Sequence, residues 1–265
     1  MFEQFQKNLR RRMAHALRGL AYDLAQSSVW QAKEDSYDIL HFARINAAAS
    51  SARYYEKNAL KARYFGSGYE LLTYCVSECR ACAQAISAEG KSPLFLEFGV
   101  HRGGTINHLA SLLPEETIYG FDVFTGLPED WRTGFTKGLF AVSKLPNVRS
   151  NVELVTGLFS ESLPPFLAAR PHAKVALLHV DCDLYSSTVD IFQNLSPMLA
   201  PGTIVCFDEY WNYPGWRMHE FKAWHEWVER HKVTYEYIGF VPSGQQTAVR
   251  ILSVSRKCMP GATSL

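Results

Sequence analysis

From Lys91 onward, short apolar runs alternate with amphipathic segments. The apolar runs have the length of buried strands, and the segments between them repeat apolar residues at helical spacing. Strands are expected at residues 93–98, 117–122, 152–156, 175–181, 203–208, 235–240 and 246–253. Helices are expected at residues 104–113, 159–169, 186–199 and 216–231. This regular alternation predicts a doubly wound α/β sheet whose strands are mostly parallel.

The last two expected strands interrupt the parallel pattern. Pro242-Ser243-Gly244 forms the turn between them, and this connection is too short for a helical crossover. The last strand is therefore expected to run antiparallel to its neighbours. Residues 91–265 are predicted to form a Rossmann-like domain around a seven-stranded sheet.

Residues 1–90 are expected to form a helical N-terminal extension or cap. Residues 1–30 have the pattern of an amphipathic helix with basic side chains beside an apolar stripe. This helix is expected to pack on the domain or on a partner subunit in a homo-oligomer, and a helix lying on a membrane surface is the alternative. A second helical stretch, residues 35–88, is interrupted near Gly66-Ser67-Gly68.

Composition and charge exclude several classes of protein. The 265 residues, 47% of them hydrophobic, are enough for one main domain with a sizeable core. The net charge of +1 provides no overall field that would recruit nucleic acid. The six cysteines follow no disulfide framework, which indicates the reducing cytoplasm. No apolar run is long enough for a transmembrane segment.

A glycine-rich turn follows the first expected strand. There the chain reads Glu97-Phe-Gly-Val-His-Arg-Gly-Gly-Thr105, so backbone N–H groups at a helix start can approach a nucleotide-like ligand. Asp122 ends the next strand, a position from which a carboxylate accepts hydrogen bonds from ribose hydroxyls. The dinucleotide fingerprint G-x-G-x-x-G is absent, and Glu97 suits a cationic cofactor such as S-adenosylmethionine. The expected cofactor contacts are Glu97, Gly99, Val100, Gly103, Gly104, Thr105, Asp122 and Asp181.

Carboxylates also end two later strands. The chain reads His179-Val-Asp181-Cys-Asp183 after one strand and Phe207-Asp208-Glu209 after another. Because parallel strands end at the same edge of a sheet, these oxygens are expected to converge and to hold Mg²⁺, which can orient a hydroxyl for attack on a methyl group. The expected metal ligands are Asp181, Asp183, Asp208 and Glu209. Capping of the following helices is the alternative role for these acids.

Histidines and a long loop supply further candidates. His179 is expected to support the metal ligands without touching the ion. His219 follows the acidic group and is a candidate for proton transfer, with a structural role as the alternative. The roughly thirty residues between Asp122 and Val152 are predicted to be a lid that closes over the substrate. Trp131 in this loop is a candidate to stack on a sugar ring or to anchor the lid.

The segment Phe95–Ile251 resembles the macrocin O-methyltransferase (TylF-type) family of class I S-adenosylmethionine-dependent methyltransferases. The similarity is carried by the four motifs Glu97–Gly104, Phe121–Trp131, His179–Thr188 and Phe207–Gly215. The resemblance implies Mg²⁺-dependent O-methylation of a small-molecule acceptor, namely a hydroxyl of a sugar or polyol in a natural product, glycolipid or polysaccharide.

The same resemblance assigns residue roles. It implies that Asp181 is a metal ligand and a candidate base, that Asp208 is a second ligand, and that Thr156 and Gly157 contact adenine. Two alternatives stay open. A metal-dependent hydroxylase of the same fold, similar to cephalosporin hydroxylase-type proteins, would share the acidic site, and a non-catalytic cofactor-binding subunit would share the glycine turn.

Overall fold

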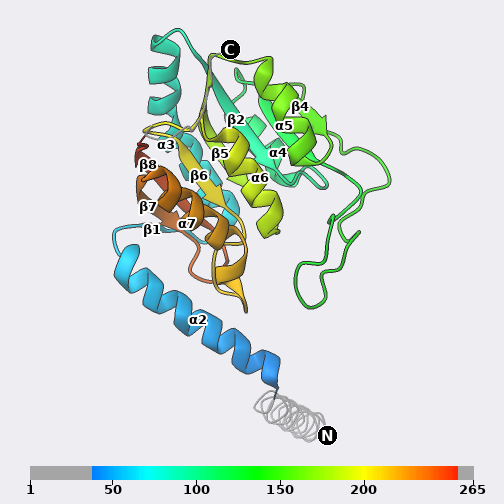
Figure 1. Ribbon diagram of the computed structural model, residues 1–265, viewed down its shortest axis with the longest axis vertical. Coiled ribbons are helices and arrows are strands. Elements are labelled where there is room, and N and C mark those ends of the chain that lie inside the picture. Colours follow the sequence, from blue (N-terminus) through cyan, green and yellow to red (C-terminus); the bar gives the residue numbers. More distant parts are fainter. Residues whose placement is uncertain (1–37, 256–265) are drawn as a thin grey trace, which may run out of the picture. The chain divides into compact units, whose positions relative to one another are not determined.

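An eight-stranded sheet positions every segment that carries the predicted chemistry (Figure 1). Along the chain, the strands are β1 (Arg63–Tyr64), β2 (Ser92–Phe98), β3 (Ile118–Asp122), β4 (Val152–Thr156), β5 (Ala173–Val180), β6 (Ile204–Phe207), β7 (Thr234–Phe240) and β8 (Thr247–Ser253). Across the sheet, they lie in the order β1-β7-β8-β6-β5-β2-β3-β4. β8 pairs antiparallel with β6 and with β7, and the other neighbouring strands pair parallel. The predicted fold class and the antiparallel last strand are therefore confirmed.

The computed structural model describes residues 38–255. The chain divides into two compact units, Met1–Asn46 and Ala47–Leu265. Helix α2 (Ile39–Asn58) begins in the first unit and ends in the second. Helix α3 (Gly68–Ala88) packs on the sheet. The domain boundary expected near residue 90 stays a prediction. The amphipathic helix predicted for residues 1–30 lies outside the described residues.

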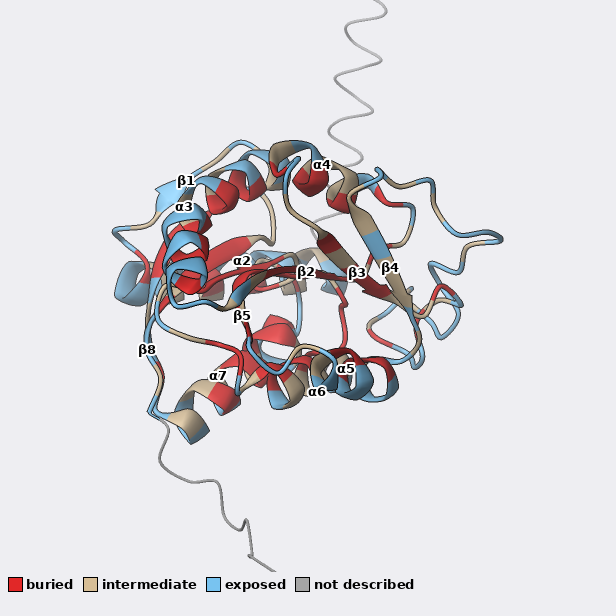
Figure 2. Cartoon of the chain, turned by 90° about the horizontal axis from the view of Figure 1, so that it is seen from above, coloured by how far each residue is buried: buried red, intermediate tan, exposed pale blue. Residues whose placement is uncertain are grey.

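Helices cover both faces of the sheet. α3 and α4 (Gly104–Leu112) lie on one face, and α5 (Phe159–Ala168), α6 (Tyr185–Leu195) and α7 (Glu220–His231) lie on the other (Figure 2). The α3 face is packed with aliphatic side chains and with buried, free cysteines. The α7 face is packed with aromatic side chains around Trp224. Both faces are buried, which explains why the central strands read as continuous apolar runs.

Two local features of the fold were not predicted from the sequence. The two-residue strand β1 adds an eighth strand, and so short a segment carries no periodic signal. The predicted helix at 216–231 is instead a 3₁₀ turn, η1 (Trp216–Met218), followed by α7, because the backbone of His219 (φ −116°, ψ −122°) is not helical. Within residues 38–255, no helix has an apolar stretch of the length that a bilayer requires.

A buried hydrogen-bond network fixes the chain just after β6. The hydroxyl of Tyr210 lies 2.6 Å from that of Tyr237 on β7 and 3.2 Å from a ring nitrogen of His225 on α7. The hydroxyl of Tyr54 on α2 lies 2.8 Å from that of Tyr237 and joins the same group. Burial, with a contribution from Arg217, lowers the pKa of His225 to about 4, so its ring is neutral at pH 7 and can accept one of these hydrogen bonds.

Gly120 tests how tightly the α4 face of the sheet is packed. A Cβ at Gly120 on β3 would lie 2.3 Å from Ile106 Cδ1 and 2.7 Å from Val100 Cγ2. We expect Gly120→Ala to lower the free energy of unfolding by about 1–3 kcal/mol, measured by urea denaturation, because the core must shift to admit the methyl group. Gly68→Ala is the matched control, since its Cβ would meet Gln246 Cγ at an ordinary 3.5 Å. Equal midpoints for the two variants would contradict this packing.

Candidate active site

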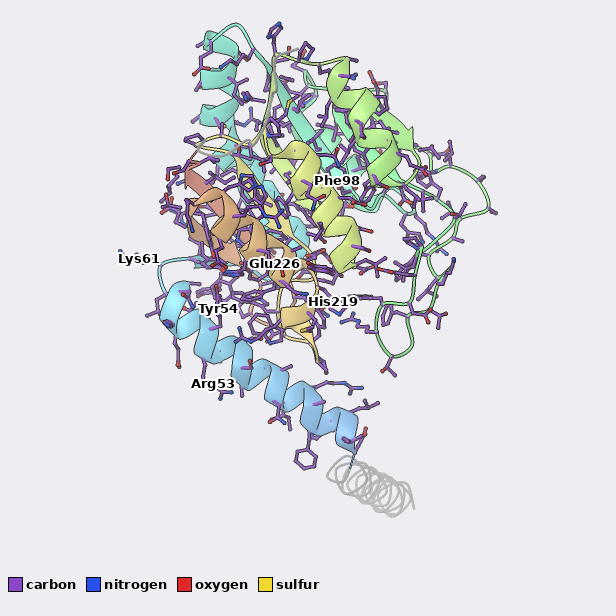
Figure 3. All side chains as sticks on the ribbon, in the orientation of Figure 1. Arg53, Tyr54, Lys61, Phe98, His219 and Glu226 are labelled. Atoms are coloured by element: carbon purple, nitrogen blue, oxygen red, sulfur yellow. The ribbon has the colours of Figure 1, made fainter. Side chains whose placement is uncertain are left out.

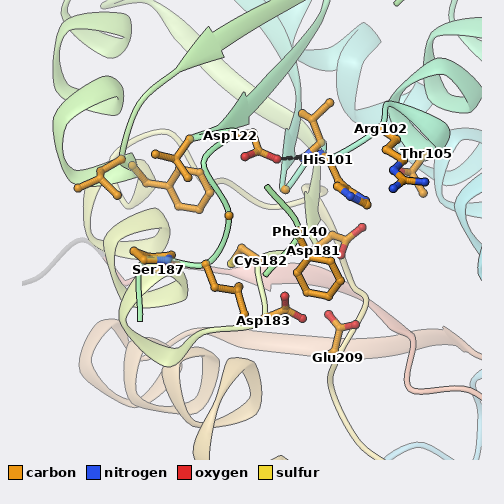
Figure 4. A pocket seen from close by; sticks show the side chains of 18 of the residues that line it. His101, Arg102, Thr105, Asp122, Phe140, Asp181, Cys182, Asp183, Ser187 and Glu209 are labelled. Carbon is orange, nitrogen blue, oxygen red and sulfur yellow. Dashed lines mark hydrogen bonds between the residues drawn. The ribbon is translucent and has the colours of Figure 1, made fainter. Parts of the chain in front are cut away.

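A cavity of about 450 Å³ opens at the carboxyl ends of the parallel strands (Figure 4). Five consecutive strand ends of the sheet contribute to its wall. The contributing residues are Gly99 after β2, Asp122 at the end of β3, Gly157 after β4, Asp181 after β5 and Glu209 after β6. A cavity of this size suits a nucleoside-containing ligand.

The glycine turn after β2 shapes one side of the cavity. Gly99 has φ 97°, and a Cβ there would lie 1.6 Å from the carbonyl oxygen of Asp181. Only glycine therefore lets the ends of β2 and β5 approach this closely. Two further positive-φ residues, His101 (φ 48°) and Gly103 (φ 80°), turn the chain into α4.

Asp122 is held rigidly against this turn. Its Oδ2 accepts hydrogen bonds from the backbone N–H groups of Val100 (2.9 Å) and His101 (2.8 Å), and its Oδ1 accepts from that of Phe124 (2.6 Å). An ionised carboxylate offers about four acceptor positions, so these three bonds leave room for one more donor. Asp122 lines the cavity and can therefore accept a hydrogen bond from a ligand hydroxyl.

Glu97 is engaged inside the protein. It is fully buried, its Oε1 accepts a hydrogen bond from Thr105 Oγ1 (3.0 Å), and its Oε2 lies 2.9 Å from His179 Nδ1. Its carboxylate therefore lies behind the cavity wall. The predicted cofactor residues that line the cavity are Gly99, Val100, Gly104, Thr105, Asp122, Gly157 and Asp181, whereas Glu97, Gly103 and Thr156 do not line it.

Two of the four predicted metal ligands, Asp181 and Asp208, bring donor atoms together at the ends of β5 and β6. Asp181, Asp183 and Glu209 line the cavity, and Asp208 Oδ1 accepts a hydrogen bond from Gln246 Nε2 (3.1 Å). Among residues 38–255, the group of donor atoms that lie within 4.8 Å of one another consists of one atom each from His179, Asp181 and Asp208. Asp183 and Glu209 are adjacent to this group but not part of it.

Helix capping does not account for these acids. α6 begins after Leu184 and α7 begins after His219, and neither N-terminus has a side-chain capping hydrogen bond. Asp183 also adopts a left-handed backbone conformation (φ 64°), which is strained for a residue other than glycine. The backbone at Asp183 is therefore strained at the point where its side chain lines the cavity.

Three carboxyl groups around the end of β5, those of Asp181, Asp183 and Glu209, have raised pKa values. Burial raises the pKa of Asp181 and of Glu209 well above their ordinary values, and the neighbouring Asp208 carboxylate raises both further. Burial raises the pKa of Asp183 to about 7, with Arg132 opposing and Asp208 adding to the shift. Burial alone would lower the pKa of His179, but its hydrogen bond to Glu97 and the charges of Glu97 and Asp208 raise it overall. Without added positive charge, these groups retain protons near neutral pH.

Glu220 is a buried carboxylate that sequence reasoning missed. It is fully buried, its Oε2 accepts a hydrogen bond from the backbone N–H of Glu209 (3.1 Å), and its Oε1 has no hydrogen-bond partner. It shares the inward face of α7 with Ala223 and Trp224. That helical spacing from two apolar residues is the signal that could have identified it.

The long loop between Asp122 and Val152 is anchored by one aromatic residue and places another against the cavity. Trp131 is buried and packs edge-on against Phe135 and Tyr213, and the Arg132 guanidinium carbon lies 3.8 Å from the centre of the Trp131 ring. Trp131 therefore anchors the loop and does not line the cavity. Phe140, by contrast, lines the cavity and makes an edge contact with His101.

His219, a predicted catalytic residue, lies where η1 meets α7 (Figure 3). Its ring packs against Trp131 and Tyr213 and does not line the cavity. Burial lowers its pKa, and the nearby Arg132 lowers it further. Its proton-transfer role is not supported by this position.

The sheet order and the cavity at its carboxyl edge define a class I methyltransferase fold. The chain belongs to the macrocin-O-methyltransferase (TylF) family, whose family model matches residues 73–239.

The sequence identity to individual relatives is 30% or less in the following comparisons. The chain is 30% identical over 154 residues to the 8-demethyl-8-(2,3-dimethoxy-alpha-L-rhamnosyl)-tetracenomycin-C 4'-O-methyltransferase of Streptomyces olivaceus, covering 49% of this chain and 57% of that one. It is 24% identical over 183 residues to the mycinamicin III 3''-O-methyltransferase of Micromonospora griseorubida, covering 59% and 68%. A crystal structure of the calicheamicin methyltransferase CalS11 matches with 25% identity and a TM-score of 0.49, covering 67% of this chain and 78% of that one. The chain thus spans less than two thirds of the length of the first relative.

The raised pKa of Asp183 predicts a pH-dependent stability. A carboxyl with a folded pKa of about 7 binds its proton more tightly in the folded than in the unfolded protein. The free energy of unfolding is therefore expected to fall as the pH rises from about 4 to about 7, by a few kcal/mol, when denaturation is measured in EDTA. Asp183→Asn is expected to flatten this slope, and Glu153→Gln on the exposed face of β4 to preserve it. A wild-type stability that stays constant or rises over this range would contradict the pKa shift.

Proposed function

We propose that this protein is an S-adenosylmethionine-dependent O-methyltransferase that methylates a hydroxyl of a sugar or polyol, on a natural product, glycolipid or polysaccharide, with the help of a divalent cation. One observation carries the proposal: the fixed carboxylate of Asp122 and the acidic group around Asp181 face the same cavity. Family membership supports the reaction, and the names of the two relatives, both O-methyltransferases, support the acceptor class.

The cavity fits S-adenosylmethionine. Asp122 keeps a free acceptor position for a ribose hydroxyl, and Leu158 and Phe159 beside Gly157 give that end of the cavity an apolar wall for a base. The start of α4 offers backbone N–H groups at Gly104 and Thr105, which suit the carboxylate of the methionine part.

The acidic group fits a divalent cation. Carboxylate oxygens are the ligands that Mg²⁺ prefers, and Asp181 and Asp208 bring two of them within 4.8 Å. The buried Oε2 of Glu209 has no hydrogen-bond partner, so it is available to a ligand. Burial raises the pKa values of Asp181 and Glu209, and the Asp208 carboxylate raises them further; a cation would offset that repulsion.

In this proposal, S-adenosylmethionine supplies an electrophilic methyl group, and Mg²⁺ supplies positive charge that makes an aliphatic hydroxyl easier to ionise. The side chains at the carboxyl ends of β5 and β6 orient the acceptor hydroxyl toward the cofactor end of the cavity. Asp183 lines the cavity beside the acidic group, so its carboxylate is placed to take the hydroxyl proton. The oxygen forms a bond to the methyl carbon, and the carbon–sulfur bond breaks with its electron pair going to sulfur.

Three expectations accompany the proposal. The protein works in the cytoplasm on a small molecule, without nucleic acid, as its charge balance and its free buried cysteines suggest. The N-terminal helices form a homo-oligomer contact. The catalytic domain folds around the sheet, with the N-terminal residues as an extension to it.

Asp122→Ala tests the cofactor site. Loss of a hydrogen bond to a charged group costs about 1.5–3 kcal/mol, so binding of S-adenosylhomocysteine is expected to weaken by about 10- to 100-fold in isothermal titration calorimetry. Glu153→Gln, an exposed carboxylate on the neighbouring strand, is the control and is expected to bind like wild type. Unchanged affinity in Asp122→Ala would remove this residue from the cofactor site.

Asp183→Asn tests the proton acceptor. We expect kcat for methyl transfer to fall by about 10²- to 10⁴-fold, while affinity for S-adenosylhomocysteine stays unchanged, because the amide cannot take the proton. The acceptor is first found by incubating glycosides and cell extracts with isotope-labelled S-adenosylmethionine and following the label by mass spectrometry. The proposed reaction is wrong if no extract gives a labelled product and the protein gains no thermal stability from the cofactor.

A further inference from the structure

His179 lies on the same side of the sheet edge as the acids. It is directly opposite Glu97 of β2 and Cys206 of β6 in the strand register. Side chains two residues apart along a strand point the same way, so His179 and Asp181 share a direction, and Asp208 lies two residues beyond Cys206. This register explains why one ring nitrogen of His179 and one oxygen each of Asp181 and Asp208 lie within 4.8 Å of one another.

The ring of His179 is already oriented. Its side chain is 1% exposed, and Nδ1 lies 2.9 Å from Glu97 Oε2, whose carboxylate is itself held by Thr105. A carboxylate that accepts the Nδ1 proton fixes both the tautomer and the plane of an imidazole, and this is the usual arrangement around metal-binding histidines. Nε2 is then the nitrogen that remains for a ligand.

We propose that His179 Nε2 is a direct ligand of the divalent cation, together with carboxylate oxygens of Asp181 and Asp208. The inference rests on the cation in the proposed function and deepens it, because the sequence suggested only a supporting role for His179. The ion and a proton compete for the Nε2 lone pair, so any proton on Nε2 is released to solvent when the ion binds.

A nitrogen ligand changes which ion the site prefers. Mg²⁺ favours an all-oxygen octahedron, whereas imidazole suits first-row transition ions. One imidazole and two carboxylates therefore favour a first-row transition ion, such as Mn²⁺, over Mg²⁺. The remaining positions are left for water and for the oxygens of the acceptor.

Pulsed electron paramagnetic resonance of the Mn²⁺-loaded full chain tests the inference directly. We expect the echo to be modulated by a nitrogen bound to the ion, and we expect the modulation to change when the protein is prepared with ¹⁵N-histidine. This comparison uses wild-type protein, so it does not depend on the folding of a variant.

Two variants identify the histidine. His179→Gln is expected to lose the nitrogen modulation and to bind Mn²⁺ more weakly, whereas His172→Gln, an exposed histidine before β5, is expected to retain both. Mn²⁺ binding without nitrogen modulation would overturn the inference and leave the proposed cation in place. Failure of wild type to bind Mn²⁺ would overturn both, while the cofactor site at Asp122 would still be judged by its own titration.

Discussion

Repulsion between half-buried carboxylates at neighbouring strand ends is the constraint on which this site depends. Parallel strands end at one edge of the sheet, so Asp181 and Asp208 are forced together. Burial and mutual repulsion raise the pKa of Asp181, which means that the group holds protons unless positive charge is supplied. Such an arrangement lowers folding stability, and arrangements of this kind occur mainly at functional sites, where a bound ligand offsets the repulsion. The cavity beside these acids is where that ligand can enter.

The surrounding structure keeps these acids in place without a ligand. Gly99 allows β2 and β5 to approach, and the Glu97–His179 pair lies behind the acidic group. Glu220 holds the backbone at Glu209, and the Tyr210 hydroxyl network fixes the next residue. The cavity is therefore preorganised on both sides of the β5 and β6 ends, and a preorganised site spends little binding energy on rearrangement.

Local sequence signals were sufficient for the framework of the fold and for the residues at strand ends. Apolar runs predicted the seven main strands, and the short turn at Pro242 predicted the antiparallel hairpin. Asp122 was expected at a strand end, and it ends β3 and lines the cavity. Contacts between distant segments could not be predicted. The partner of Glu97 is 82 residues away along the chain, so its burial away from the cavity depends on strand register. The helical spacing of Glu220 from Ala223 and Trp224 places it on the apolar face of α7, but its hydrogen bond to the backbone of Glu209 depends on a contact between distant segments.

The most direct test of the account is a crystal structure grown with Mn²⁺ and S-adenosylhomocysteine, with anomalous diffraction used to locate the ion. We expect one anomalous peak between the carboxylates of Asp181 and Asp208, and electron density for the nucleoside beside Asp122. A structure in which the two carboxylates point apart with no ion between them, or in which the nucleoside lies elsewhere, would contradict this expectation.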